Sequence, residues 1–195
     1  MITINTLTNL FVETKLNNFR EPRDRKYNIN EAYCKGGEVL YKSNQDKDTH
    51  IWHLYINKGN FILEREDDPI NTRITLFNFY DENKNIQQVD ITFDQNMAPF
   101  VVFVMDNMSK LWSKSTDLKD ITLYGNHPKI MLDKEKLIDT ATSDVLLFVS
   151  KNRKLYYALQ RNNFEDFTLI AENDKCNLIY RVGWTKDNKI GVYWR

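Results

Sequence analysis

Two of the three histidines lie close together, in the segment His50-Ile51-Trp52-His53. In a helix this spacing would place both rings on one side, where they could share a metal ion. The segment is rich in β-forming residues, however, and in a strand the two rings would point to opposite faces. We therefore expect no shared metal site here. His127 precedes Pro128 in a composition typical of turns, so we expect its ring to lie in solvent.

Acidic side chains are concentrated in two runs, Glu64-Arg65-Glu66-Asp67-Asp68 and Asp46-Lys47-Asp48. A glycosidase needs two carboxylates about 5–9.5 Å apart across a cleft, one of them kept protonated by an apolar pocket. Neither run specifies such a pair, and charged runs of this kind are usually solvated loops. The second run also lacks the later glycine and glutamate of a calcium loop. We therefore predict no catalytic residue, no metal and no cofactor, and we predict that the chain is not an enzyme.

Lysine and arginine together number 27, as do aspartate and glutamate, so the formal net charge is zero. A neutral chain has no overall field that would draw it to nucleic acid or to an anionic membrane. The longest apolar run, residues 99–105, is far shorter than the ~20 residues of a membrane-spanning helix. Cys34 and Cys176 show no ligand spacing, which together with the missing signal peptide indicates a reducing cytoplasm. We expect a soluble protein without a membrane span and without a specific nucleic-acid partner.

From about residue 33 onward, short runs rich in Val, Ile, Phe, Tyr and Trp alternate with clusters of Asn, Asp, Lys and Gly. Such runs are typical of β-strands separated by turns. We interpret residues 130–139 as a loop. The expected strands are 51–56, 61–64, 73–80, 88–93, 100–105, 110–113, 145–150, 154–159, 167–171, 178–184 and 189–194.

Four pairs of these strands share one pattern, in which a polar turn is followed by Asn or Lys and then a large apolar residue. The anchor residues are Asn60, Lys110, Lys154 and Lys189, spaced by 50, 44 and 35 residues. Asn and Asp in the turns tolerate left-handed backbone angles, which favours antiparallel hairpins. A repeat near 45 residues is about the length of one propeller blade. The sequence therefore predicts an all-β fold of repeated antiparallel hairpins or meanders, propeller-like or a partial propeller, with little helix.

All four tryptophans fall in these hairpins, where packing is favoured over stacking on sugars. Neighbouring residues of a strand point to opposite faces of the sheet. Where one residue of a neighbouring pair is buried, we therefore expect an aromatic ring at the other position to face outward. Outward aromatic rings are common where a partner docks. We predict interface positions at Trp112, Tyr156, Tyr157 and Trp194.

Three stretches, within about residues 74–195, resemble β-repeats of virion structural proteins of tailed bacteriophages. The first is a strand followed by Phe93-Asp94-Gln95-Asn96, a proline and a second apolar strand. The second combines Ser143-Asp144-Val145 with Gln160-Arg161-Asn162-Asn163-Phe164. It departs from that family at its two asparagines, where the family tends to carry Asp and Arg. The third runs through 178–184, ending in Arg-Val-Gly-Trp.

The resemblance implies a subunit of the phage particle, in the tail or neck, that assembles with copies of itself or with other virion proteins. It implies synthesis in the cytoplasm of a bacterial host and residence in the virion, and it carries no catalytic residue. Residues 1–73 lie outside the resemblance, and we interpret them as a β-rich docking or assembly segment before a β-repeat domain at 74–195.

Two alternatives remain open. The first is a receptor- or glycan-binding module at a tail tip, which would use outward Tyr and Trp rings to bind a host glycan. The second is a depolymerase or other glycoside hydrolase, whose activity would be lost on changing Asp67 or Asp94.

Overall fold

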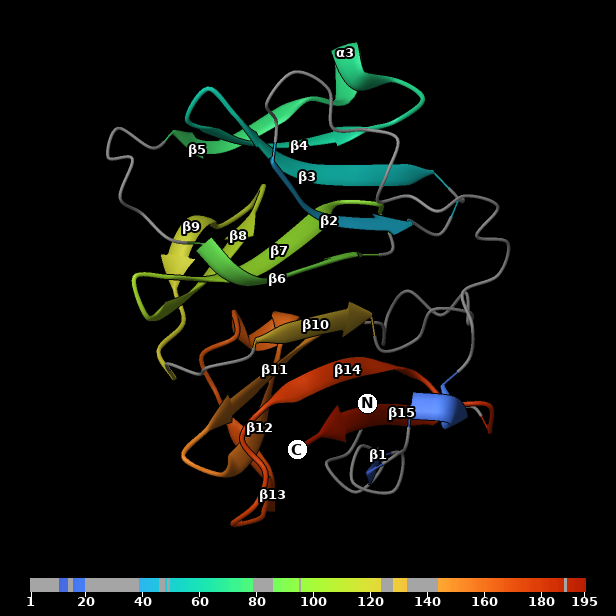
Figure 1. Ribbon diagram of the computed structural model, residues 1–195, viewed down its shortest axis with the longest axis vertical. Helices are drawn as coiled ribbons and strands as arrows, with labels where there is room; N and C mark the ends of the chain where they lie inside the picture. Colours follow the sequence, from blue (N-terminus) through green and yellow to red (C-terminus); the bar gives the residue numbers. More distant parts are fainter. Residues whose placement is uncertain are drawn as a thin grey trace.

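The structure is a computed structural model in which strands dominate (Figure 1). Short helical turns occur at Leu16–Asn18, Gln160–Asn162 and Pro69–Thr72, the last labelled α3. Among the described residues, no helix has the length and apolar character that crossing a membrane requires. The structure describes residues 11–13, 16–19, 39–45, 48, 50–78, 86–94, 96–123, 128–132, 144–187 and 189–195.

The strands form four sheets, and in the first three each strand pairs with the next one along the chain. Sheet 1 contains β2 (Val39–Gln45), β3 (Ile51–Asn57), β4 (Asn60–Arg65) and β5 (Ile74–Asn78). Sheet 2 contains β6 (Ile86–Phe93), β7 (Pro99–Met105), β8 (Met108–Ser113) and β9 (Asp117–Asp120). Sheet 3 contains β10 (Lys129–Leu132), β11 (Val145–Lys151), β12 (Lys154–Leu159) and β13 (Thr168–Glu172).

Sheet 4 joins the two ends of the described chain. It contains β14 (Ile179–Trp184) and β15 (Ile190–Trp194), which are antiparallel. The short strand β1 (Phe11–Glu13) pairs with β15 in parallel, from the opposite end of the sequence. The expected all-β class with antiparallel meanders and little helix is therefore confirmed.

The hairpins predicted from the four anchor residues are all present, joining β3 to β4, β7 to β8, β11 to β12 and β14 to β15. In the β7–β8 turn, Asp106 and Asn107 have positive φ angles of 52° and 62°. The turns at Lys58–Gly59 and Asn152–Arg153 also have positive φ at both central residues. This backbone matches the right-handed twist of the strands, which is why Asn, Asp and Gly recur in these turns.

Three clusters of buried apolar side chains each fill the space between two consecutive sheets. Cluster A, between sheets 1 and 2, contains Trp52, Leu54, Phe61, Leu63, Leu76, Ile86, Val89, Ile91, Phe93, Val101, Phe103, Met105 and Trp112. Cluster B, mainly between sheets 2 and 3, contains Phe100, Val102, Leu111, Ile121, Ile130, Val145, Leu147, Val149, Ala158 and Phe164. Cluster C, mainly between sheets 3 and 4, contains Met131, Leu146, Phe148, Leu155, Tyr157, Cys176, Ile179, Ile190, Val192 and Trp194.

The apolar run of β7 is explained by its position between two clusters. Phe100 and Val102 point into cluster B, whereas Val101 and Phe103 point into cluster A. A strand that is buried on both faces has no polar face to present, so alternation of apolar and polar residues disappears. The same holds for β11, where Leu147 belongs to cluster B and its neighbours on either side belong to cluster C.

The first strand of each sheet lies next to the first strand of the following one: β2 contacts β6, β6 contacts β10, and β10 contacts β14. In Figure 1 these strands meet near the middle of the molecule, and the later strands of each sheet lie farther out. Sheet 1 extends upward from this region, sheet 2 to the left, and sheets 3 and 4 downward.

The structure has a strand in every range where one was predicted, but β1, β2, β9 and β10 lie outside those ranges. The prediction of a loop at 130–139 is wrong for its first residues, because 130–132 belong to β10 and pair with β11. Residues 133–143 lie outside the described part of the chain. The predicted boundary between residues 1–73 and 74–195 falls inside sheet 1, where β4 pairs with β5 across it.

Candidate interaction surfaces

Three of the four predicted interface residues pack inside this chain. Trp112 is 5% exposed in cluster A, and Tyr157 and Trp194 are buried in cluster C. Tyr156 is only half-buried. Trp112 and its neighbour Leu111 do point to opposite faces of β8, but both faces are covered by clusters. Contact of these residues with a partner stays a prediction.

The indole of Trp194 makes its polar contact within the chain. Its Nε1 donates a hydrogen bond to Ser150 Oγ at 3.0 Å, and that hydroxyl donates to the backbone oxygen of Asn177 at 2.8 Å. Ser150 is fully buried. Since Trp194 belongs to sheet 4 and Ser150 to sheet 3, the polar atom of this ring connects two sheets.

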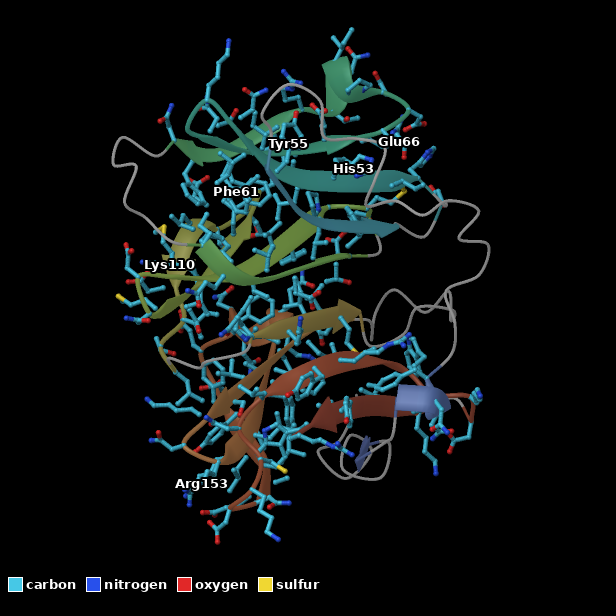
Figure 2. The ribbon with its side chains drawn as sticks, in the orientation of Figure 1. His53, Tyr55, Phe61, Glu66, Lys110 and Arg153 are labelled. Atoms are coloured by element: carbon cyan, nitrogen blue, oxygen red, sulfur yellow. The ribbon has the colours of Figure 1, made fainter. Side chains whose placement is uncertain are left out.

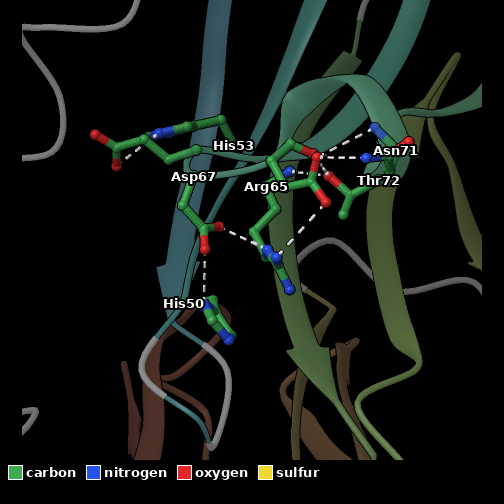
Figure 3. A network of polar contacts seen from close by, with 8 residues as sticks. His50, His53, Arg65, Asp67, Asn71 and Thr72 are labelled. Atoms are coloured by element: carbon green, nitrogen blue, oxygen red, sulfur yellow. Dashed lines mark hydrogen bonds and ion pairs between the residues drawn. The ribbon is translucent and has the colours of Figure 1, made fainter.

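The two neighbouring histidines contact different carboxylates (Figure 3). His50 Nδ1 lies 3.1 Å from Asp67 Oδ2, and His53 Nε2 lies 3.3 Å from Glu66 Oε2. Burial lowers the pKa of His53 below its ordinary value, although Glu66 acts in the opposite direction. The ring is therefore held mainly neutral near pH 7, and it joins β3 to the segment after β4. His127 lies outside the described residues.

The helical turn α3 is attached to the end of β4 by a network of polar contacts (Figure 3). Asp68 is its N-cap and accepts a hydrogen bond from Asn71 Nδ2 at 2.9 Å. Thr72 Oγ1 donates to the Asp68 backbone oxygen at 2.6 Å and accepts from the Arg65 backbone nitrogen at 2.9 Å. The Arg65 side chain also lies 2.6 Å from Asp67 Oδ1. The short turn is thus held by contacts on both of its sides.

The segment that follows α3 is fixed by a buried carboxylate. Glu64 of β4 is almost fully buried, and Arg73 Nε donates to its Oε2 at 2.7 Å. Arg73 Nη2 also donates to the hydroxyl of Tyr55 at 3.2 Å, on the face of sheet 1 opposite cluster A (Figure 2). Glu64 raises the pKa of Arg73, so the guanidinium stays charged and compensates the buried carboxylate.

This scaffold presents an exposed apolar side chain among acidic groups. Ile70 is 89% exposed, more than the other large apolar side chains that the structure leaves exposed. The carboxylates of Glu66 and Asp67 beside it in the sequence are about half exposed. We call Glu66, Asp67, Asp68 and Ile70 the α3 knob.

The acidic residues considered for hydrolase activity lie in different sheets. Asp67 follows β4 in sheet 1, whereas Asp94 forms the turn between β6 and β7 of sheet 2. Asp94 Oδ1 accepts hydrogen bonds from the backbone nitrogens of Asn96 and Ala98, at 2.8 and 2.9 Å. Asp94 therefore shapes the turn between β6 and β7, a role for short acidic side chains in turns.

The residues around Asp144 and Arg161 also have a structural role in this chain. Asp144 is buried, and its carboxylate accepts hydrogen bonds from the side chain and the backbone nitrogen of Arg161. The Val145 backbone nitrogen donates to Gln160 Oε1 at 3.2 Å. The residues separated in the sequence thus meet at one end of the β11–β12 hairpin. Asn162 donates a hydrogen bond to Asp166 at 3.0 Å.

Sheet 4 carries aromatic and basic side chains on the face opposite cluster C. Tyr180 is 55% exposed, and its ring centroid lies 5.4 Å from that of Tyr193. The guanidinium of Arg195 lies 5.0 Å from the Tyr193 ring centroid, a cation–π distance. Arg181 pairs with Tyr193 across the strands and covers the ring of Phe19 at 4.6 Å. We call Tyr180, Arg181, Tyr193 and Arg195 the Tyr/Arg face.

A β-bulge brings two consecutive residues to this face. The register of β14 against β15 shifts between Ile179 and Arg181, so that Tyr180 is the extra residue. In a regular strand Tyr180 and Arg181 would point to opposite faces of the sheet. Because a bulge leaves no clear signal in the sequence, residue alternation does not place both side chains on one face.

The outer strand of sheet 3 presents an apolar edge. β13 pairs with β12 on one side, and in the described part of the chain no strand pairs with its other side. Leu169 of β13 is 47% exposed. By contrast β9, the outer strand of sheet 2, reads Asp-Leu-Lys-Asp.

Comparison with models of protein families, with curated proteins and with solved structures gives no match for this chain.

Proposed function

We propose that this chain is a structural component of a tailed-phage virion, in the tail or neck, that works by protein–protein assembly. The observation that carries the proposal is the partly exposed edge of β13, whose sequence Thr-Leu-Ile-Ala-Glu has one charged residue, at its end. An open edge offers unpaired backbone donors and acceptors to a strand of another chain. The phage-like segments around Asp94 and Asp144 give the proposal its biological setting.

The contrast with β9, the outer strand of sheet 2, supports this role of the β13 edge. Natural proteins protect outer strands with charged side chains, and β9 has three of them in four residues. In β13 the terminal Glu172 lies 3.5 Å from Lys154 of the neighbouring strand, which reduces its effect as a charge at the edge. The exposed Leu169 then adds apolar contact for an incoming strand.

We further propose that the four sheets are the blades of a partial propeller. Two observations support it: each sheet begins next to the first strand of the preceding one, and apolar clusters fill the space between consecutive sheets. Sheet 4 has three strands rather than four, with β1 added in parallel. In this arrangement, neighbouring subunits would cover the open edges of the outer strands.

The proposal is tested on particles of the virus whose genome encodes the chain. Mass spectrometry of gradient-purified particles should find it in several copies per particle, at a constant ratio to the major tail protein. A chain that is abundant in the infected-cell lysate but missing from intact particles would contradict the proposal.

The edge itself is tested by Leu169→Lys, which places a charge on the open side of β13. We expect incorporation into particles to fall at least tenfold, because burying a lysine in a new strand pair is unfavourable, while the melting temperature stays close to that of the wild type. Thr75→Lys, on the exposed side of outer strand β5, is the matched control and should be incorporated normally. Equal incorporation of both variants would exclude β13 as the assembly edge.

A further inference from the structure

We propose that the α3 knob of one copy binds the Tyr/Arg face of a second copy, so that copies associate head to tail. The inference rests on the proposed assembly function and names one contact within it. Its basis is the chemistry of two separate surfaces, each of which combines exposed and half-buried side chains.

The α3 knob is a preformed projection. Ile70 is 89% exposed, yet the turn that carries it is fixed by Asp68, Thr72 and the Arg65 backbone. A rigid exposed side chain loses little conformational freedom when it binds, which favours association. Burial of Ile70 on a partner would remove this apolar side chain from water.

The two surfaces are opposite in charge. Residues 64–73 contain four carboxylates and two guanidinium groups, and burial keeps His53 mainly neutral, so the knob is net negative. The Tyr/Arg face carries the guanidinium groups of Arg181 and Arg195. Among the described residues, no carboxylate forms an ion pair with Arg195. Opposite charges on two patches favour encounter and fix orientation.

The apolar parts also correspond. The rings of Tyr180 and Tyr193 form a tilted pair at 5.4 Å, and Tyr180 has its larger part in solvent. Tyrosine and arginine are enriched among the residues that contribute most to protein–protein binding. The aromatic pair offers an apolar surface for Ile70, with the guanidinium of Arg195 beside it for the half-exposed carboxylate of Glu66.

The position of the two surfaces determines the type of assembly. In Figure 1, α3 lies at one end of the longest axis, and the end of β15 lies in the other half of the molecule. Contact between two different surfaces is heterologous, so each pair of copies keeps one unused knob and one unused face. Such contacts build a closed ring or an open filament.

Mixing two variants tests the head-to-tail contact. Ile70→Asp disables the knob and Tyr180→Asp disables the face, while circular dichroism and melting temperature verify folding. In sedimentation velocity at micromolar concentration, the wild type should form species larger than dimers, and each variant alone should associate at least tenfold more weakly. An equimolar mixture should form dimers and nothing larger, because only one intact knob can meet one intact face.

A second pair of variants tests the charges. Arg195→Glu should weaken association at least tenfold, and association of the wild type should weaken as salt is raised. Lys186→Glu makes the same charge change at an exposed position of the β14–β15 turn, outside the Tyr/Arg face, and should leave association unchanged. Association reduced equally by both variants would overturn the assignment of the face.

The inference and the proposed function fail separately. A monomeric wild type, or a variant mixture without dimers, would overturn the contact even if particles contain the chain. A monomeric chain that binds an immobilised glycan, and loses that binding on Tyr180→Asp, would overturn it in favour of a carbohydrate site. Head-to-tail dimers of a chain that is absent from particles would support the contact and contradict the virion role.

Discussion

At the scale of single residues, the hydroxyl of Ser150 has two roles in cluster C, because it accepts from Trp194 and donates to Asn177. In Ser150→Ala the buried indole N–H would lose its acceptor, at a cost of about 1–3 kcal/mol in the free energy of unfolding. Urea denaturation measures this loss. We expect the double variant Ser150→Ala, Trp194→Phe to lose less than the sum of the single changes, since no unpaired indole N–H remains.

Ser115→Ala is the matched control for this prediction. Ser115 is exposed, and its hydroxyl lies 3.1 Å from that of Ser113. Water replaces a lost surface hydrogen bond, so the free energy of unfolding should change by less than about 0.5 kcal/mol. An equal loss for Ser115→Ala and Ser150→Ala would show that burial of the indole N–H is not the cause.

The buried ring of His53 makes stability depend on pH. Burial lowers the pKa of His53 below its ordinary value of 6.5. Between the lowered pKa and pH 6.5, this histidine is therefore protonated more in the unfolded chain than in the folded chain. This contribution to stability is complete above about pH 6.5 and is lost as the pH falls through the lowered pKa. Chemical denaturation from pH 8 to pH 5 should show the decline.

The comparison with His53→Gln isolates this residue from the other titrating groups. The difference in free energy of unfolding between wild type and variant should change with pH below about 6.5, because only the wild type has the buried imidazole. A constant difference across the pH range would contradict the prediction.

The outward residues show where sequence alternation reaches its limit. It correctly separates Leu111 from Trp112 on opposite faces of β8, but it cannot tell that both faces are covered. It also cannot locate the bulge that brings Tyr180 and Arg181 to the same face. Whether a face is covered depends on the stacking of whole sheets, which local spacing does not specify.

At the scale of secondary-structure elements, the backbone of the turn between β11 and β12 is strained, and one substitution should relieve this strain. Arg153 has a φ of 63° at the second central position of the turn, where glycine is the preferred residue. Arg153→Gly creates an Asn-Gly turn and should raise the free energy of unfolding by about 0.5–1 kcal/mol. Figure 2 shows Arg153 at the lower end of the molecule, far from Glu66 of the α3 knob.

The control for the turn is Arg153→Ala. It removes the exposed pair of Arg153 with Asp174, which is 3.7 Å long, but keeps the unfavourable left-handed angle at a residue with a Cβ. No stabilisation is expected for it in thermal denaturation. If both variants are stabilised equally, loss of the arginine rather than relief of backbone strain is responsible.

Turn chemistry made the hairpins predictable, because the polar turns before Asn60, Lys110, Lys154 and Lys189 carry their own local signal. The strands that the sequence analysis did not identify have weaker patterns. β9 is mostly charged. β10 has four residues, and two adjacent ones, Ile130 and Met131, point into different clusters. Elements that owe their structure to the strand beside them cannot be recognised from composition alone.

At the scale of the whole molecule, each middle sheet belongs to two clusters, so the sheets should not unfold separately. Phe103 is fully buried and contacts Phe61 and Phe77 of sheet 1 at ring-centroid distances of 5.4 Å. Phe103→Ala should lower the free energy of unfolding by about 3–5 kcal/mol. Tryptophan fluorescence and far-UV circular dichroism should report the same single transition, at lower denaturant than in the wild type.

A control variant and a contrary result test whether the loss in Phe103→Ala comes from the shared core. Thr75→Ala, at an exposed position of β5, should leave the transition within about 0.5 kcal/mol of the wild type. Two separate transitions in Phe103→Ala, with sheet 4 melting at the wild-type midpoint, would show that clusters A and C are energetically independent.

The order of the sheets was partly predictable, since repeated meanders were expected and are present. The extent of each repeat was harder to predict. Sheet 1 continues across the predicted boundary between residues 73 and 74, and β1 pairs with β15 from the other end of the described chain. Pairing between distant segments depends on the complete three-dimensional arrangement rather than on local sequence.

The parallel pairing of β1 with β15 has a consequence for biosynthesis. Among the described strands β1 leaves the ribosome first and its partner strand β15 is translated last, so at 5–20 residues per second β1 waits roughly 10–35 s for β15. During that interval the nascent polypeptide carries an unmatched strand and an incomplete cluster C. Chaperone occupancy should therefore be highest late in translation and should end soon after β15 emerges.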